Sequence, residues 1–197
     1  MSLGLLKAAA RAENSDGLHL MRLLILLRCA DKRGRTPKPV EGITKLAKLD
    51  FLLRYPVYLE RALIQLGKST SDLDLPPRER TTVETKMIRF RYGPWDGRYR
   101  RWLTLLASRG LLRVSMKGRK IEIGLTEEGR VLADDLSGQT IFADLADRGT
   151  IVMKTVGDMS GTRLKDFVYE IVPEITGMKW GQEIAADVGT GVNGEPL

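Results

Sequence analysis

The chain has 197 residues, of which 43% are hydrophobic and 29% charged, a composition typical of a globular protein with a sizeable core. Its formal net charge of +7 favours an acidic partner, and nucleic acid is the commonest one. One cysteine and one histidine exclude an internal disulfide and a Cys/His zinc site. We therefore expect no metal and a cytoplasmic location.

The first part of the chain predicts an arm followed by a buried helix. Residues 1–17 are small and mildly amphipathic, and we expect a flexible N-terminal arm rather than a signal peptide. Residues 18–30 are nearly all apolar but too few to cross a membrane, which takes about 20 residues. We interpret them as a central buried helix, with His19 at the surface or a boundary and Cys29 as a small buried hydrophobe.

Residues 31–66 predict a polar connector and two helices. The connector, residues 31–42, contains two prolines. A helix over 43–55 places Asp50 and Arg54 at the i,i+4 spacing of a helical ion pair. Pro56 breaks this helix, and a second one follows over 57–66.

Residues 68–85 have no apolar period and contain two prolines, so they predict a long loop. Such a loop inside a compact domain is uncommon and is often functional or disordered. It separates the second group of helices from the basic segment that follows.

Residues 86–130 hold the excess positive charge. They contain twelve lysines and arginines against four acids, a net charge of +8, so the rest of the chain has a net charge of −1. Alternation of apolar residues with Arg89 and Arg91 predicts a strand over 86–92, with the arginines on its exposed face. A purely solvated surface would carry both signs of charge, and this segment favours nucleic acid.

The same segment continues with a helix and a hairpin. Asp96 is a plausible N-cap for a helix over 97–109, which Gly110 ends. A hairpin over 111–125 carries Lys117, Arg119 and Lys120 at its turn. A helix followed directly by a basic-tipped hairpin is typical of a winged helix-turn-helix, whose helix enters the DNA major groove and whose wing contacts phosphates or the minor groove.

The C-terminal third predicts further helices. Thr126 can cap a helix over 127–136, residues 140–156 are short and apolar, and Ser160 can cap a helix over 162–172. The apolar stripe of this last helix consists of Leu164, Phe167, Val168 and Ile171. We expect the stripe at an interface, either within the chain or with a partner copy, and a homodimer as the oligomeric state.

The predicted fold class is mainly α with a small antiparallel β-sheet. The predicted organisation is an arm (1–17), a winged-helix domain (18–137) with a loop insertion (68–85), a C-terminal helical extension (138–185) and a disordered tail (186–197). Double-stranded DNA is the expected ligand. The candidate DNA-binding residues are Arg89, Arg91, Arg98, Arg100, Arg101, Thr104, Ser108, Lys117, Arg119 and Lys120.

The common catalytic motifs are missing from the sequence. It contains no GxxxxGK[ST] phosphate-binding loop and no GxSxG, HExxH or CxxC motif. We therefore expect a protein that is not an enzyme, has no cofactor and leaves any ATP chemistry to a partner.

Three stretches carry a family resemblance: residues 46–56 (LAKLDFLLRYP), 92–96 (YGPWD) and 160–175 (SGTRLKDFVYEIVPEI). In this order the chain, from about residue 18 to residue 180, resembles the middle-component proteins of bacterial ABC-three-component systems. The resemblance implies a small non-enzymatic winged-helix accessory of an SMC/Rad50-like ATPase, acting in defence against phage or plasmid DNA. It supplies no catalytic residue, and the 68–85 loop departs from a plain winged helix.

Two other functions remain open from the sequence. One is a stand-alone dimeric transcriptional repressor that reads a palindromic operator with Arg100, Arg101 and Thr104. The other is a winged-helix module that binds only protein. Salt-dependent binding of duplex DNA separates the first two hypotheses from the third.

Overall fold

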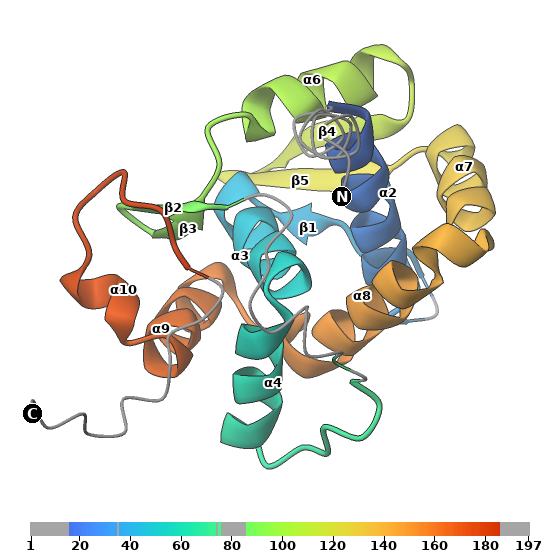
Figure 1. Cartoon of the computed structure of the whole chain (residues 1–197). Coiled ribbons are helices and arrows are strands. Elements are labelled where there is room, and N and C mark those ends of the chain that lie inside the picture. The colour runs from blue at the N-terminus through green and yellow to red at the C-terminus, as the bar shows by residue number, and fades with distance from the viewer. Residues whose placement is uncertain (1–15, 35, 74, 76–85, 186–197) are drawn as a thin grey trace, which may run out of the picture.

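The computed structural model describes residues 16–34, 36–73, 75 and 86–185 (Figure 1). Within these residues the protein is mainly helical, with a small antiparallel sheet, as the sequence predicts. The expected arm up to residue 15, the tail 186–197 and loop residues 76–85 lie outside the described part. In chain order the elements are α2 (Asp16–Asp31), β1 (Val40–Glu41), α3 (Ile43–Arg54), α4 (Pro56–Gln65), β2 (Ile88–Phe90), β3 (Gly93–Trp95), α6 (Tyr99–Ser108), β4 (Leu112–Lys117), β5 (Lys120–Leu125), α7 (Glu127–Ser137), a 3-10 turn (Thr140–Phe142), α8 (Ala143–Val156), α9 (Gly161–Ile171) and α10 (Glu174–Gly177).

Helices α2 and α3 form the centre of the fold. The run from Leu23 to Leu27 in α2 is at most 2% exposed, because α7 and α8 pack along this helix (Figure 1). Every residue of α3 from Lys45 to Arg54 is buried. The prediction of a buried helix over 18–30 is confirmed, and so is the buried state of Cys29. Among the helices that the structure describes, none is long and apolar enough to cross a membrane.

The sheet has the strand order β1-β5-β4, with both pairs antiparallel. Near its base the sheet contributes Leu112, Ile123 and Leu125 to the core, and Gly118 makes the turn with a positive φ of 61°. No pattern in the sequence predicts β1, because two residues are too few to show alternation. Val40 pairs with Ile123 and is 1% exposed. The segment forms a strand because it is buried against the edge of the hairpin.

A second hairpin joins β2 and β3, with Ile88 opposite Trp95. The predicted strand over 86–92 is shorter in the structure, where β2 covers Ile88–Phe90 and Gly93 and Pro94 belong to the partner strand β3. The segment around Ile184 returns to this hairpin: its amide donates to the carbonyl of Met87 at 2.8 Å. The Tyr55 hydroxyl accepts from the amide of Met87 at 2.6 Å and donates to the carbonyl of Ile184 at 3.1 Å.

The C-terminal helices pack onto the rest of the chain and share one core with it. Ser160 caps α9 by accepting a hydrogen bond from the amide of Arg163, as predicted. The apolar stripe of α9 is at most 5% exposed, because α3 and α4 cover it within the same chain (Figure 1). Of the two predicted alternatives, the interface within the chain is the one observed, and the buried stripe is not available to a partner copy. Its members fill the core: Leu164, Phe167, Val168 and Ile171.

Candidate nucleic-acid interface

Helix α6 divides into a buried and an exposed face, as its sequence period predicts. Tyr99, Trp102 and Leu106 are at most 1% exposed. The opposite face is open to solvent and consists of Arg100, Arg101, Thr104 and Ser108. The helix begins at Tyr99, two residues later than expected, and the Asp96 carboxylate accepts from the amide of Arg98 at 3.0 Å.

A buried ionic network fixes α6 on the central helices. The carboxylate of Asp50 is fully buried and accepts from Arg22 Nε at 2.7 Å and Arg54 Nε at 2.9 Å. The hydroxyl of Tyr99 donates to it at 2.6 Å, which ties α6 to α3. Burial opposes ionisation, but the two guanidinium groups hold the pKa of Asp50 well below its usual range. The predicted pair of Asp50 and Arg54 is confirmed as one part of this network.

The expectation for His19 is wrong: the ring is 0% exposed. It packs against Trp102 with the two rings tilted and their centroids 4.4 Å apart, and its Nδ1 lies 2.9 Å from Nη2 of Arg22. Burial, followed by the nearby guanidinium of Arg22, lowers the pKa of His19 from 6.5 to about 4. Arg22 lies one helical turn further along α2, but Trp102 belongs to α6, and no residue near His19 in sequence indicates that contact.

Two of the predicted DNA-contacting arginines have structural roles in the fold. Arg89 is half-buried, donates to the carbonyl of Ile175 at 2.9 Å and lies 5.7 Å from the ring of Tyr169. Arg98 pairs with Asp96 at 2.9 Å and lies over Trp102 at 4.8 Å. These contacts attach β2 and the start of α6 to their neighbours and use much of each guanidinium.

The other predicted cations lie at the surface. Arg101 pairs with Asp16 at 2.6 Å, and Arg91 lies over the ring of Tyr92 at 5.5 Å. In the hairpin β4–β5, Lys117 is 3.7 Å from Glu122 and Lys120 is 2.7 Å from Glu41. Arg100 and Arg119 are exposed as well, the first on α6 and the second at the hairpin turn.

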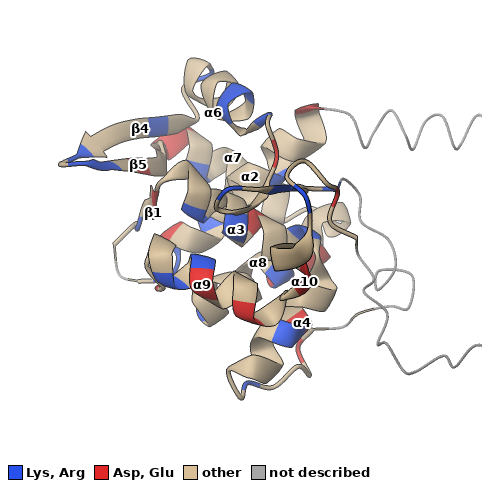
Figure 2. Cartoon of the chain, turned by 90° about the vertical axis from the view of Figure 1, so that its left-hand side faces the viewer, with Lys and Arg blue, Asp and Glu red and all other residues tan. Residues whose placement is uncertain are grey.

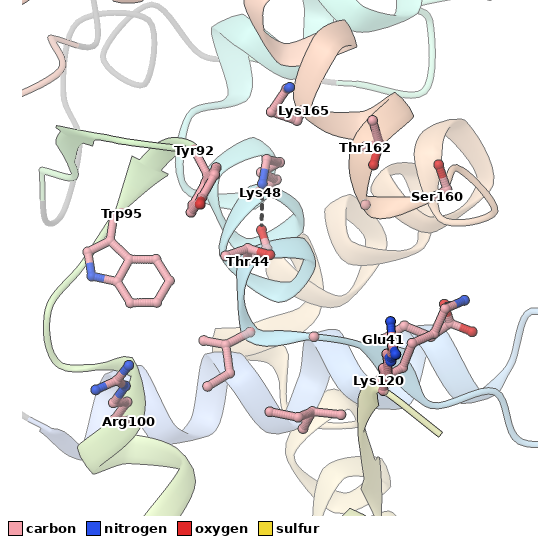
Figure 3. A pocket seen from close by; sticks show the side chains of 15 residues that line it. Glu41, Thr44, Lys48, Tyr92, Trp95, Arg100, Lys120, Ser160, Thr162 and Lys165 are labelled. Atoms are coloured by element: carbon pink, nitrogen blue, oxygen red, sulfur yellow. Dashed lines mark hydrogen bonds and ion pairs between the residues drawn. The ribbon is translucent and has the colours of Figure 1, made fainter. Parts of the chain in front are cut away.

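A groove of about 680 Å³ brings several of these cations together (Figure 3). Arg100 of α6 and two hairpin residues, Arg119 and Lys120, line it, as the sequence predicts for one basic surface. Lys48 of α3 and Lys165 of α9 line the same groove, and the sequence did not indicate them. Figure 2 shows basic segments on α6, α3, α9 and the outer end of the hairpin in one view. We call this space the cationic groove.

Lys48 is the least exposed cation of the cationic groove, at 2%. Its Nζ donates to the carbonyl of Thr44 at 2.9 Å, and within the described residues no carboxylate forms an ion pair with it. Burial, and then the charge of Lys165, lowers the pKa of Lys48 from 10.5 to about 8. This buried ammonium therefore has unused donors and no counter-ion.

The first turns of α3 and α9 also line the cationic groove. The N-cap of α3 is Gly42, which has no side chain to bond the first amides of the helix. At α9, the Ser160 hydroxyl accepts from the amide of Arg163. The amides of Gly161 and Thr162 lie in the same first turn and are not bonded by this cap. Helix N-termini carry a partial positive charge and free N–H groups, which suit an anion.

A second, apolar groove of about 520 Å³ lies between α6 and the sheet. Leu103 and Ala107 of α6 face Val114 and Ile121 of the hairpin across it. The side chains of Val114 and Ile121 are 49% and 36% exposed, so this face of the hairpin is not fully covered.

No group of three or more His, Cys, Asp or Glu side chains within the described residues is placed to hold a metal ion. Comparison of the chain with protein-family models, curated proteins and solved structures gave no match. The geometry of the two grooves is therefore the basis for a functional proposal.

Proposed function

We propose that this chain is a winged-helix protein that binds double-stranded DNA through α6 and the hairpin β4–β5. The order of elements supports the winged-helix assignment. A helix, a short strand, two further helices and the hairpin β2–β3 precede α6. Two strands follow it, and β1 pairs with β5 in the order β1-β5-β4. In such proteins the helix before the hairpin enters the major groove.

The observation that carries the DNA-binding proposal is the shared lining of the cationic groove. Arg100 of α6 and two cations of the hairpin turn, Arg119 and Lys120, face one space. A helix and a wing that bind one duplex must present their cations on the same side. On the exposed face of α6, Thr104 and Ser108 line the apolar groove together with Arg100.

The first test is the salt dependence of duplex binding. Each phosphate contact releases condensed counterion, so log affinity falls by about 0.9 per contact for each unit of log salt. The variant Lys117→Ala/Arg119→Ala/Lys120→Ala should reduce this slope by about 3 and weaken all sequences alike. A matched control, Lys38→Ala/Lys154→Ala/Lys179→Ala, removes the same number of exposed cations elsewhere and should keep the slope of the parent.

The second test separates base reading from phosphate binding. If Arg100 reads a base edge, Arg100→Ala should cost about 1–3 kcal/mol and do so only for the preferred sequence. If the triple hairpin variant and Arg100→Ala/Arg101→Ala both bind duplex DNA as the parent does, the DNA proposal fails.

We further propose that the protein is the non-enzymatic, cytoplasmic accessory subunit of an SMC/Rad50-like ATPase that acts in defence against foreign DNA. The three motifs that resemble middle-component proteins support this assignment. Co-purification with an ATPase encoded beside the gene is the test. A stand-alone repressor would instead prefer its own promoter by about 10³-fold or more over random DNA. A homodimer, which light scattering would detect, must use a surface other than the buried stripe of α9.

The apolar groove favours a second candidate function, a module that binds only protein. Val114 and Ile121 line this groove and are exposed, and Met116 is 67% exposed on the same face of the hairpin. Under this alternative, Met116→Lys would abolish partner binding and leave any DNA affinity unchanged. Under the DNA proposal, the basic variants would show the larger effect.

A further inference from the structure

The cationic groove has a feature that contact with a duplex leaves unused, namely the deeply placed ammonium of Lys48. A duplex reaches exposed cations such as Arg100 and Arg119, whereas Lys48 is 2% exposed and lies between α3 and α9 at the inner side of the groove (Figure 3). A buried charge without a counter-ion is costly unless a bound group of opposite sign offsets that cost.

The surroundings of Lys48 favour a phosphate group as the bound anion. Lys165 of α9 faces the same space, and the first turn of α9 presents the amides of Gly161 and Thr162. A Cβ added at Gly161 would meet nothing within 4 Å, so the approach to these amides is open. The lone carboxylate in the lining is Glu41, which is already paired with Lys120 at 2.7 Å. Lys165 forms a solvent-exposed ion pair with its neighbour Asp166 at 3.1 Å, which a bound phosphate would replace.

Two aromatic side chains line the cationic groove beside these donors. Tyr92 is 48% exposed, and Trp95 is half-buried between Phe90 and Tyr99. In Figure 3 both rings lie to one side of Lys48, with Thr162 and Ser160 on the other side. Aromatic faces bind nucleic-acid bases by stacking, without dependence on the base. The volume of about 680 Å³ is in the range of pockets that hold small ligands.

We propose that the cationic groove binds a nucleotide, with its phosphate between Lys48, Lys165 and the N-terminus of α9 and its base against Tyr92 and Trp95. The nucleotide is either free in solution or an unpaired 5′-phosphorylated end of a strand. The nucleotide occupies the inner part of the groove at Lys48, whereas a duplex contacts the exposed cations of the same groove, Arg100, Arg119 and Lys120.

Calorimetric titration of the full chain with AMP, inorganic phosphate and adenosine tests the proposal. AMP should bind at least about tenfold more tightly than either phosphate or adenosine, because only AMP offers both groups. Lys48→Met and Lys165→Ala should each weaken AMP binding about tenfold or more. Tyr92→Ala should lower the affinity for AMP toward that for phosphate, and the exposed control Lys154→Ala should bind as the parent does.

Failure of AMP to saturate the protein at millimolar concentration would overturn the proposal, and so would unchanged binding by both Lys48→Met and Lys165→Ala. Competition of AMP with a 5′-phosphorylated single strand identifies the source. A strand that displaces AMP at lower concentration than free nucleotide assigns the site to strand ends, and a strand that fails to displace it assigns the site to free nucleotide.

Failure of the nucleotide proposal can be distinguished from failure of the DNA-binding proposal. Lys48→Met changes a side chain that a duplex does not reach, so it should lose AMP and keep the duplex affinity of the parent. Binding of AMP by a protein that ignores duplex DNA would leave this site in place and remove only the DNA-binding proposal.

Discussion

Helix α3 carries buried charges of two kinds on different sides. Toward α2 and α6, Asp50 accepts from two arginines and a tyrosine, so its charge is fully matched. Toward the cationic groove, Lys48 is as deeply buried but has one backbone carbonyl as its partner. The first arrangement stabilises the architecture, and the second destabilises the apoprotein while preparing it for an anion. The way a buried charge is matched thus separates structural from functional residues in one helix.

The largest effect is expected from breaking the matched charge. Asp50→Ala leaves the guanidiniums of Arg22 and Arg54 buried without their carboxylate. Removing one partner of a buried pair costs about 3–5 kcal/mol, so the free energy of unfolding should fall by that amount. Urea denaturation measures it.

Asp135→Ala is the matched control, because that carboxylate is exposed on α7. It should change the stability by less than about 0.5 kcal/mol. If Asp50→Ala proves no more destabilising than this control, the network is not architectural.

Substitution of Lys48 should instead raise the free energy of unfolding. A fall of its pKa from 10.5 to about 8 corresponds to a cost of about 3 kcal/mol for the charged side chain at neutral pH. Lys48→Met removes this cost and loses one hydrogen bond to Thr44, worth about 1 kcal/mol. We expect the variant to be more stable by about 2 kcal/mol in urea at pH 7. A destabilised variant would show that the ammonium is better matched than its contacts indicate.

A pH effect of similar size is expected from His19. Its folded-state pKa of about 4 lies below the 6.5 of the unfolded chain, so the unfolded chain binds the proton first as the pH falls. Stability is therefore complete above pH 6.5 and is lost progressively toward pH 4. Between pH 7.5 and pH 5 the loss should be about 2 kcal/mol.

Thermal or urea denaturation at these two pH values tests the assignment. The single histidine of the chain makes the attribution direct. His19→Asn should remove most of the difference between the two pH values, and an undiminished difference would assign it to other groups.

The smallest loss of stability is expected at the surface ion pairs of Asp134. Arg28 and Lys32 both contact Asp134, at 2.7 Å and 2.8 Å, and hydrogen bonding by Arg28 lowers the pKa of Asp134 to about 2. The carboxylate is 41% exposed, so solvent screens the interaction. We expect Asp134→Ala to cost about 1 kcal/mol or less in urea denaturation. A loss as large as that of Asp50→Ala would remove the distinction between buried and exposed pairs.

The sequence predicted the elements whose patterns are local. The period of α6, the cap at Ser160 and the hairpin with its basic turn follow from residues within a few positions of each other. Strand β1 was not predicted, because it has only two residues and its pairing with β5 joins residues about 80 positions apart. The stripe of α9 was visible, but the surface that covers it depends on the tertiary fold.

The same distinction between local and distant contacts explains which residues of the candidate interface the sequence predicts and which it does not. Arg100, Arg119 and Lys120 lie within one basic segment and line one groove. Lys48 looks like an ordinary solvated lysine in a helix, because nothing near it in sequence shows that α9 packs over that side. Arg89 looks exposed in an alternating strand, but Ile175 lies 86 positions later and accepts its hydrogen bond.

The distant hydrogen-bond partners of the Tyr55 hydroxyl imply an order in which parts of the fold form. It joins α3 to Met87 and to Ile184, which lies 129 positions further along the chain. Contacts so distant in sequence form slowly, because a large loop must close before any contact energy is gained. The hairpin β4–β5 pairs residues on either side of a two-residue turn, so it should acquire protection from hydrogen exchange first. The cationic groove, which needs α9 in place, should complete its formation with the last kinetic phase.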